Sequence, residues 1–307
     1  MTRRSGAGLL ALAMGATAAL TTSLGASAAM AAEDLMGQPT PGGIDFQPAA
    51  SVLKADAIFF HNKILLPITV LISLFVLGLL VYVVVRFNKK ANPVPARWSH
   101  NTTVEIVWTV LPVIILAVIS IFSFRLLYKY HDMPKPDVTV KVTGNQWYWS
   151  YEYPELGDYA FDSHQMPEAE AKAKGLPYRL AADNPMVVPV GKTVRLLVTG
   201  ADVIHAVALP AFGLKTDAIP GRVNETWFKA DRTGVFYGQC SELCGVDHAF
   251  MPLQINVVTE AEYAAWAAPH KPAPAAPAAE TAPADANAAE TAPADTANAT
   301  VAAAPAA

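Results

Sequence analysis

Two long runs without a charged residue constrain this chain more than any other feature of its sequence. Residues 64–85 read ILLPITVLISLFVLGLLVYVVV, and residues 106–124 read IVWTVLPVIILAVISIFSF. At ~1.5 Å per helical residue these runs reach about 33 and about 28 Å, close to the ~30 Å hydrocarbon core of a bilayer. The sequence therefore predicts two transmembrane helices, over 64–87 and 104–128.

The segment between these helices, 88–103, sets their orientation. Together with Arg86 just before it, this segment supplies Lys89, Lys90 and Arg97, and it contains no acidic residue. Loops rich in Lys and Arg face the cytoplasm. We therefore expect residues 32–63, as an outer N-terminal segment, and the chain after about 129 to lie on the opposite side of the membrane.

The two ends of the chain have the composition of segments outside a folded core. Residues 1–31 carry Arg3 and Arg4 before an alanine-rich apolar stretch, with small residues at Ala29 and Ala31. This pattern predicts a cleaved secretory signal, with a retained anchor helix as the alternative. Residues 267–307 contain no aromatic residue and repeat the unit AAETAPAD. Such a tail cannot bury enough apolar surface to fold, so it is predicted to be disordered.

Residues 131–265 have the pattern of a β-rich domain. Runs such as DVTVKVTG, PMVVPVGKTVRLLVTG and MPLQINVVTE are rich in β-branched residues and are separated by Gly, Pro and Asp. Short strands with turn signals between them predict a sandwich or barrel. This segment holds 17 acidic and 11 basic residues, a net charge of −6. That balance would attract a basic partner and repel nucleic acid, although plain solubility explains it equally well.

The stretch 237–252, YGQCSELCGVDHAFMP, holds the only two cysteines of the chain, Cys240 and Cys244, followed by His248 and Met251. A disulfide between them would close a very small loop. Their spacing also fits one helical face, but Gly245 and the proline at the end of the stretch favour a loop. Thiolate, imidazole and thioether donors together favour copper over zinc. A mononuclear blue-copper site uses one cysteine; two cysteines could instead bridge a pair of copper ions.

Either copper site needs a second histidine from elsewhere in the fold. His205 follows the strand-like run KTVRLLVTG. A lone histidine among apolar residues is usually a core residue, but the other histidines of the domain, His131 and His164, lie in polar, loop-like runs. These two points favour His205 as the additional ligand, with a core histidine as the alternative.

Together these features resemble subunit II of bacterial haem–copper cytochrome c oxidases. The resemblance covers about residues 50–258 and is carried by the helical hairpin, GNQWYWSYEYP, DVIH, GLKTDAIPGR and the motif C-x-E-x-C-x₃-H-x₂-M. It implies a transmembrane hairpin followed by an all-β cupredoxin-like domain that holds a binuclear copper centre, CuA. The ligands it implies are His205, Cys240, the backbone carbonyl of Glu242, Cys244, His248 and Met251. Asn145 and Val207 depart from common family patterns without touching a ligand.

The resemblance also implies roles outside the copper ligands. The Glu242 carboxylate would bind a magnesium ion shared with subunit I, with a solvated loop acid as the alternative. Trp147 would receive electrons from cytochrome c. Glu105 would mark a proton entrance to subunit I, while T-x-x-E from Thr102 also fits a helix capping box. A rim of acids around Trp147 would dock a lysine-rich cytochrome c: Glu152, Glu155, Asp158, Asp162 and Asp202.

The activity implied is that of one subunit of a proton-translocating oxidase. Electrons from cytochrome c would pass through CuA to haem a of subunit I, where dioxygen is reduced to water with coupled proton pumping. The implied partners are subunits I and III, cytochrome c and membrane lipid, without nucleic acid. The implied location is the bacterial inner membrane, with both termini and the copper domain on the periplasmic side.

Three other classes share parts of this pattern. Membrane-anchored copper chaperones use Cys-x₃-Cys and a distant histidine, but with one anchor helix and a thioredoxin-like α/β domain. Quinol oxidase subunit II has the scaffold without the copper ligands. Nitrous oxide reductase has a similar copper cluster without the hairpin or the Glu242 pattern. The chain also has no C-x-x-C-H motif, so a separate cytochrome c is expected to donate the electrons.

Overall fold

The computed structural model describes residues 36–271. The predicted signal peptide, 1–31, lies outside the described residues, as does the predicted tail beyond residue 271. Both therefore stay predictions.

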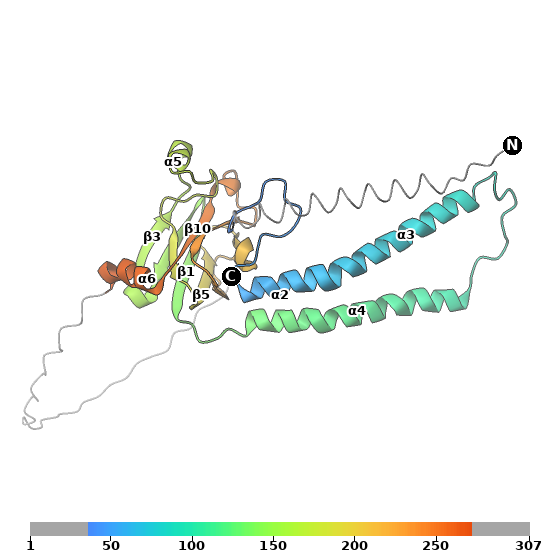
Figure 1. Cartoon of the computed structure of the whole chain (residues 1–307), viewed down its shortest axis with the longest axis horizontal. Coiled ribbons are helices and arrows are strands. Elements are labelled where there is room, and N and C mark those ends of the chain that lie inside the picture. Colours follow the sequence, from blue (N-terminus) through green and yellow to red (C-terminus); the bar gives the residue numbers. More distant parts are fainter. Residues whose placement is uncertain (1–35, 272–307) are drawn as a thin grey trace, which may run out of the picture. The chain divides into compact units, whose positions relative to one another are not determined.

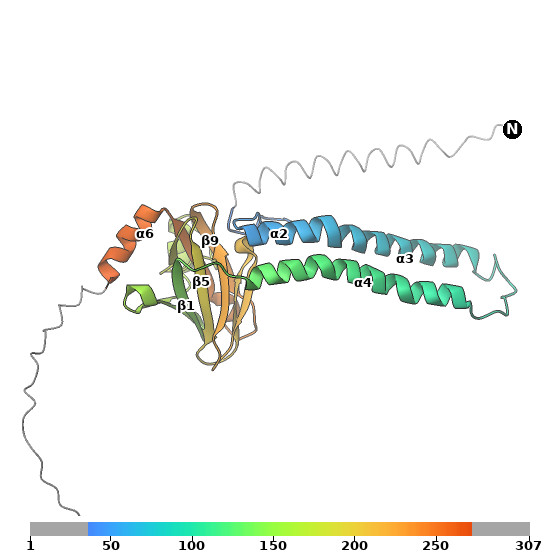
Figure 2. The same cartoon turned by 90° about the horizontal axis from the view of Figure 1, so that it is seen from below.

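Two long apolar helices form a hairpin, as predicted. The first begins with α2 (Val52–Phe60), passes through the π-helical segment η1 (His61–Leu65) and continues as α3 (Leu66–Arg86); the second is α4 (Thr102–His131). Figures 1 and 2 show α3 and α4 running side by side. The predicted membrane span of 64–87 coincides closely with α3, and the helix extends beyond it toward the N-terminus, to Val52. The Ser51 side chain caps it by accepting a hydrogen bond from the backbone N–H of Lys54, at 3.1 Å.

The predicted capping box at the start of the second helix is displaced by one residue. Asn101, and not Thr102, is the N-cap: its side chain accepts the N–H of Val104 at 3.2 Å. The Glu105 carboxylate accepts the N–H of Asn101 at 3.2 Å. Glu105 therefore supports the helix start, as a reciprocal capping arrangement does.

The domain that follows is a sandwich of two five-stranded sheets. The first sheet has the order β3-β2-β1-β5-β8 and comprises β1 (Val138–Asn145), β2 (Tyr148–Tyr153), β3 (Tyr159–Ser163), β5 (Thr193–Gly200) and β8 (Asn224–Lys229). The second has the order β4-β10-β9-β6-β7 and comprises β4 (Met186–Pro189), β6 (His205–Leu209), β7 (Leu214–Ala218), β9 (Gly234–Cys240) and β10 (Pro252–Val258). The predicted all-β sandwich is confirmed.

Alternation along the strands explains why two sheets form. Burial in β2 alternates strictly, with Trp149, Tyr151 and Tyr153 fully buried and their neighbours partly exposed. The inward side chains meet those of the facing sheet, including Phe236 of β9, in one continuous core. An aligned sandwich buries one face of each sheet in this way.

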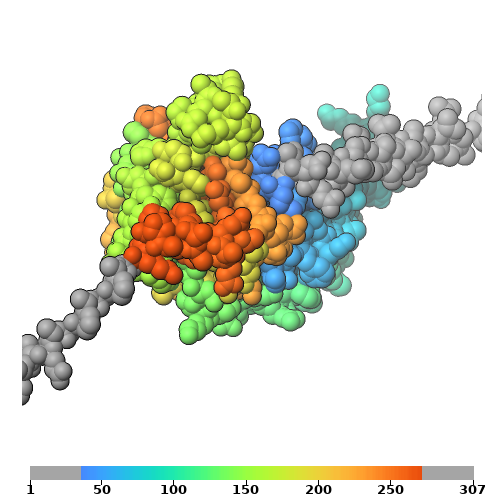
Figure 3. All heavy atoms as spheres, turned by 60° about the vertical axis from the view of Figure 1, so that its left-hand side comes forward, coloured from blue at the N-terminus to red at the C-terminus, as the bar shows by residue number. Residues whose placement is uncertain are grey.

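The ordered chain extends further than predicted at its C-terminal end. The helix α6 (Glu260–Ala267) and the 3₁₀ turn η5 (Ala268–His270) follow β10. The Trp266 ring lies 5.0 Å from that of Tyr153, and the His270 ring stacks on Tyr159 at 3.7 Å. The predicted domain end at 265 and tail start at 267 are therefore wrong by several residues. Figure 3 shows α6 on the domain surface and the segment of α5 (Glu168–Ala173) standing out as a lobe.

Hydrogen bonds connect the hairpin to the sandwich. The Ser51 hydroxyl donates to the carbonyl of Phe212 at 2.9 Å, in the 3₁₀ turn η3 (Pro210–Phe212). The Trp227 indole donates to the carbonyl of Tyr130 at 2.9 Å, and the Tyr130 hydroxyl donates to that of Gly213 at 3.1 Å. The start of α2 and the end of α4 are thus attached to the sandwich by hydrogen bonds.

Candidate metal centre

Strand pairing brings the predicted ligands together from distant parts of the sequence. β9 and β10 are antiparallel neighbours, with Pro252 opposite Gln239, so the loop 241–251 closes over one end of the sheet. β6 pairs with β9 on the other side, with Val207 opposite Cys240. His205, at the start of β6, therefore lies beside Cys240 although 35 residues separate them.

The two cysteines are free thiols. Their sulfur atoms are 3.9 Å apart, whereas a disulfide requires about 2.05 Å. Cys244 Sγ also lies 3.5 Å from His248 Nδ1 and 3.5 Å from Met251 Sδ. Cys240 Sγ lies 3.9 Å from His205 Nδ1. The disulfide alternative is thus not the arrangement of the described chain.

These donors have the spacing of a metal site. The ligand atoms of His205, Cys240 and Cys244 all lie within 4.8 Å of one another. Two sulfur ligands at about 2.3 Å from one metal can be at most about 4.6 Å apart, so the 3.9 Å sulfur pair fits a shared ion. The Cys240 thiol is also 3.3 Å from the carbonyl oxygen of Glu242. Soft sulfur with imidazole nitrogen is a donor set suited to copper.

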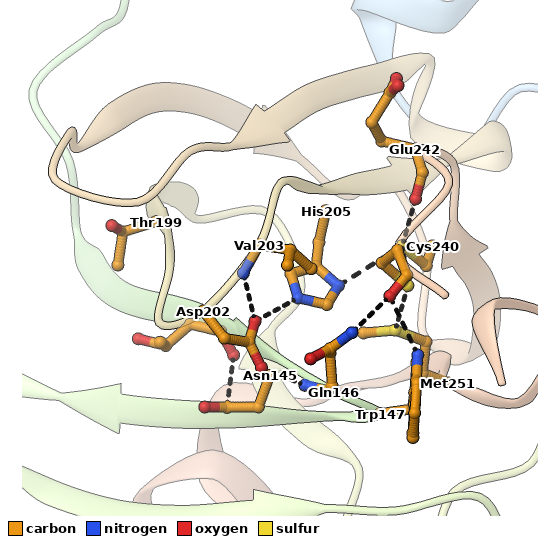
Figure 4. Close-up of polar contacts among 12 residues, drawn as sticks. Asn145, Gln146, Trp147, Thr199, Asp202, Val203, His205, Cys240, Glu242 and Met251 are labelled. Atoms are coloured by element: carbon orange, nitrogen blue, oxygen red, sulfur yellow. Dashed lines mark hydrogen bonds and ion pairs between the residues drawn. The ribbon is translucent and has the colours of Figure 1, made fainter. Parts of the chain in front are cut away.

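A carboxylate orients the buried histidine. Asp202 Oδ1 accepts a hydrogen bond from His205 Nε2 at 2.8 Å, which leaves Nδ1 facing Cys240 (Figure 4). Backbone N–H groups of Gln146 and Val203 also donate to Asp202, each at 2.7 Å. Partial burial alone would raise the pKa of Asp202, but the hydrogen bonds from His205 and the two backbone groups lower it overall. The carboxylate is therefore held ionised against the imidazole, an arrangement common around metal ligands.

Close approach to the centre requires glycine at two positions. A Cβ on Gly144 would lie 2.8 Å from the His205 ring. Gly245, with φ of +124°, occupies a conformation that other residues rarely adopt, and a Cβ there would lie 2.9 Å from Trp147 Cζ2. These glycines allow the β1–β2 turn to sit directly against the ligand loop.

Trp147 lies on that turn, partly exposed and in contact with the ligand loop. Its indole N–H donates to the carbonyl of Cys244 at 3.2 Å, and the Gln146 side chain donates to the same carbonyl at 2.8 Å. Trp149 is fully buried, and its indole donates to the carbonyl of Met251 at 3.1 Å. The contacts of Gln146 and Trp149 with the ligand loop were not predicted from the sequence. Both residues lie within two positions of Trp147, and their contacts depend on the geometry of the turn.

The metal-free Cys244 thiol resists ionisation. Burial, together with the neighbouring Cys240 thiol, raises the pKa of Cys244 to about 12. A metal must therefore displace a proton from the Cys244 sulfur, so metal uptake is coupled to proton release.

The predicted docking acids do not form one rim around Trp147. Glu152, Glu155 and Asp158 lie at the opposite end of β2, because the strand runs away from Trp147 for about 17 Å before the β2–β3 turn. Glu152 pairs with Lys141 at 2.7 Å, and Glu155 accepts the N–H of Thr139 at 3.0 Å. The prediction that these three acids surround Trp147 is therefore wrong.

The other two acids lie nearer the metal centre. Asp162 faces Ser150 in the β2–β3 pair and accepts its hydroxyl at 2.6 Å. Asp202 lies next to the turn, but its carboxylate orients His205. Glu105 is at the far end of α4 and is not part of the cluster.

Replacing Asp202 with alanine is expected to lower the copper affinity of the site about ten- to hundred-fold, because the imidazole loses the partner that fixes its tautomer. Copper retained against a competing chelator measures the effect. Asp217→Ala is the control, since Asp217 lies on β7, opposite Ala206, and its side chain is not hydrogen-bonded to any proposed ligand. Equal retention by the two variants would contradict the orienting role.

Comparisons with known proteins agree with this arrangement. Residues 138–258 match the family model described as cytochrome c oxidase subunit II, periplasmic domain, and residues 39–126 match its transmembrane domain. The chain is 46% identical over 265 residues to cytochrome c oxidase subunit 2 of Cereibacter sphaeroides, covering 81% of this chain and 87% of that protein. It is 48% identical over 233 residues to the probable cytochrome c oxidase subunit 2 of Rickettsia bellii, covering 75% and 85%.

A solved structure is similar to the outer domain. The crystal structure of the periplasmic domain of subunit II of cytochrome oxidase of Bradyrhizobium japonicum is 60% identical, covers 45% of this chain and 96% of that one, and superposes with a TM-score of 0.42. The family models and the curated relatives together span both the hairpin and the sandwich. The chain therefore belongs to the cytochrome c oxidase subunit II family and is a subunit of a cytochrome c oxidase complex.

Proposed function

We propose that this subunit accepts electrons from cytochrome c at a binuclear copper centre and passes them to haem a of subunit I. The observation that carries the proposal is the convergence of six donors on one end of the sandwich, with the sulfur atoms of Cys240 and Cys244 3.9 Å apart and unlinked. The proposed ligands are the side chains of His205, Cys240, Cys244, His248 and Met251 and the backbone carbonyl of Glu242.

The residues of the chain hold the donors in place before any metal binds. Asp202 fixes the tautomer of His205, and Trp149 anchors the backbone of Met251. These residues would hold two copper ions, which would supply reversible one-electron chemistry at this site. The core side chains around Cys240 and Met251, which are 7% and 1% exposed, exclude water from that site.

We infer that Trp147 is the surface group through which electrons reach this site. It is partly exposed and hydrogen-bonded to the backbone of a proposed ligand, Cys244, at 3.2 Å. A fully buried indole such as Trp149 could not touch a donor protein. Asp162 and Asp202, on the same side of the domain, would contribute negative charge toward a basic cytochrome c.

The Glu242 carboxylate is free to bind a second metal. Figure 4 shows it pointing away from the sulfur cluster, while the backbone carbonyl of the same residue points toward Cys240. No residue within 36–271 pairs with this carboxylate. We propose that it binds a magnesium ion shared with subunit I. When Mn²⁺ replaces magnesium in the complex, we expect an electron paramagnetic resonance signal from bound Mn²⁺, and Glu242→Gln should abolish that signal.

The membrane arrangement follows from the charges at the helix ends. Basic residues cluster between α3 and α4, so we propose a cytoplasmic loop in the bacterial inner membrane, with the copper domain in the periplasm. Subunits I and III and cytochrome c are the proposed partners, and subunit I is the proposed site where dioxygen is reduced to water with coupled proton pumping. Cleavage of 1–31 as a signal peptide stays a prediction.

Glu105 is the proposed proton entrance. Its partly exposed carboxylate lies in the first turn of α4 and accepts a hydrogen bond from the Asn101 N–H at 3.2 Å. Because glutamine can accept the same hydrogen bond, Glu105→Gln should keep the helix start intact. We expect it to slow oxygen consumption several-fold while cytochrome c still reduces the copper centre normally; unchanged turnover would refute the role.

The experiment that tests the proposed function is removal and return of copper in the purified complex. Chelation should abolish cytochrome c oxidation, and added copper should restore it, because electrons from cytochrome c would have no other route into the complex. Persistent cytochrome c oxidation by complexes in which this subunit holds no copper would refute the proposal.

A copper chaperone is the alternative function for a Cys-x₃-Cys protein with a distant histidine. The fold argues against it, because the outer domain is a ten-stranded sandwich and not a thioredoxin-like α/β domain. The second membrane helix and the thioether of Met251 within 3.5 Å of Cys244 also separate this chain from that class.

A further inference from the structure

A groove runs along the inner faces of the transmembrane hairpin, apart from the metal centre and its ligands. Its outer part is a cavity of about 350 Å³ between α2 and α4. A second cavity of about 260 Å³ lies between α3 and α4, farther from the sandwich along the hairpin. Figures 1 and 2 show the two helical arms alongside each other over this length.

The outer cavity combines cations with aromatic walls. Arg125 and Lys129, one helical turn apart on α4, line it together with Phe59 and Phe122. Lys129 forms an ion pair with Asp56 across the cavity. Arg125 has no ion-pair partner among the described residues, so the cavity presents an uncompensated guanidinium. A guanidinium prefers phosphate and carboxylate groups, which it binds through paired N–H donors.

The inner cavity has no polar lining. Its walls are side chains of isoleucine, leucine and valine alone, at Ile68, Leu71, Ile72, Ile114, Ile115 and Val118. It continues the outer cavity, because Ile64 and Phe122 line the outer one and lie a single turn from Ile68 and Val118. One groove therefore runs from a cationic end to an apolar end.

The groove has the length of one lipid molecule. From Asp56 to Ile72 the helix rises about 24 Å, and half of a bilayer measures about 20 Å with its headgroups. Arg125 is the first charged residue after the apolar run of α4, so it lies where the headgroups of the adjoining leaflet begin. The polar and apolar ends of the groove thus match the polar and apolar ends of a phospholipid.

We propose that this groove binds a glycerophospholipid, with its phosphate on Arg125 and an acyl chain between α3 and α4. A helix of another subunit is a poorer occupant, because a helix with its side chains is about 10 Å wide. Free inorganic phosphate could satisfy Arg125 but would leave the apolar cavity empty.

Photo-crosslinking in the complete oxidase complex tests the proposal. A diazirine amino acid replaces Val118 at the base of the groove, and the delipidated complex is titrated with palmitoyl-oleoyl phosphatidylglycerol. Mass spectrometry then identifies the adduct at position 118. We expect a lipid adduct that saturates with one lipid per complex, and millimolar inorganic phosphate should not compete with it.

Variants distinguish specific binding of phosphatidylglycerol at Arg125 from general attraction of the anionic lipid to positive charge on the protein. Arg125→Gln should raise the phosphatidylglycerol concentration for half-maximal labelling about ten-fold, and Arg125→Lys should raise it less. Lys63→Gln is the matched control, since Lys63 lies near the same membrane level but does not line either cavity. Its labelling curve should be unchanged.

Three results would overturn the proposal. An adduct with a peptide of another subunit would mean that a helix fills the groove. Equal weakening by Arg125→Gln and Lys63→Gln would mean that only general surface charge attracts the lipid. Loss of labelling with inorganic phosphate would mean that a free anion occupies the outer cavity.

Discussion

Replacing Cys240 with serine is expected to leave the sandwich folded and to abolish its binuclear copper. Serine is nearly isosteric, and its hydroxyl can donate to the Glu242 carbonyl as the thiol does at 3.3 Å. A hydroxyl does not replace a bridging thiolate for a soft metal. Because losing an outer-sphere partner alone costs about ten- to hundred-fold in metal affinity or activity, losing this ligand should lower cytochrome c oxidation by at least about hundred-fold.

Copper content and oxygen consumption of the purified complex measure this effect, and thermal unfolding checks the fold. Ser241→Ala is the matched control: it alters the neighbouring side chain but keeps the backbone bond to Ala206, at 3.0 Å. Normal oxygen consumption by Cys240→Ser would sink the assignment of this thiol. The thermal unfolding data distinguish a variant that has lost copper because it is misfolded from a folded variant that has lost only its copper.

Replacing Trp147 with phenylalanine is expected to slow the transfer of electrons from cytochrome c about two- to ten-fold. The change removes the indole N–H that donates to the Cys244 carbonyl at 3.2 Å. One such hydrogen bond contributes about 0.5–1.5 kcal/mol, and about 1.4 kcal/mol in a barrier is ten-fold in rate. The copper ligands themselves are unchanged, so copper content should stay normal.

Stopped-flow mixing of ferrocytochrome c with the oxidised complex measures that rate directly. Tyr148→Phe is the control, because Tyr148 neighbours Trp147 and stacks on His164 instead of contacting the ligand loop. A normal rate for Trp147→Phe would show that electrons enter elsewhere. A rate loss matched by equal copper loss would mean that Trp147 only supports the site.

The sequence predicted the features that depend on local composition. Two uncharged runs suffice to predict two membrane helices, because the bilayer core admits few alternatives. Short runs rich in β-branched residues, separated by turn residues, predicted a sandwich or barrel, and two cysteines beside a histidine and a methionine in one short stretch predicted a metal centre. His205 was favoured by the polar surroundings of the other histidines and was implied as a ligand by the family resemblance, and the structure places its Nδ1 3.9 Å from Cys240 Sγ.

Features that depend on the turn of a hairpin were not predictable in the same way. Glu152, Glu155 and Asp158 are close to Trp147 in sequence, but a strand of six residues carries them to the other end of the sheet. The sequence indicated only a docking role for Asp202. Its hydrogen bond to His205 depends on a loop conformation that sequence spacing does not specify, so the orienting role was not predicted.

The prediction of where the domain ends, at residue 265, was wrong for a related reason. The alanine-rich composition after Thr259 resembles that of the tail, so only the packing of Trp266 and His270 on β2 and β3 aromatics distinguishes α6 from it. Tertiary contacts, and not helix propensity, decide where the domain ends.

The central claim, that this sandwich holds two copper ions acting as a single electron carrier, is tested most directly by electron paramagnetic resonance of the isolated, copper-loaded outer domain, with metal analysis on the same sample. We expect two coppers per chain and one unpaired electron coupled equally to both nuclei. One copper per chain, with the electron confined to a single nucleus, would contradict the claim.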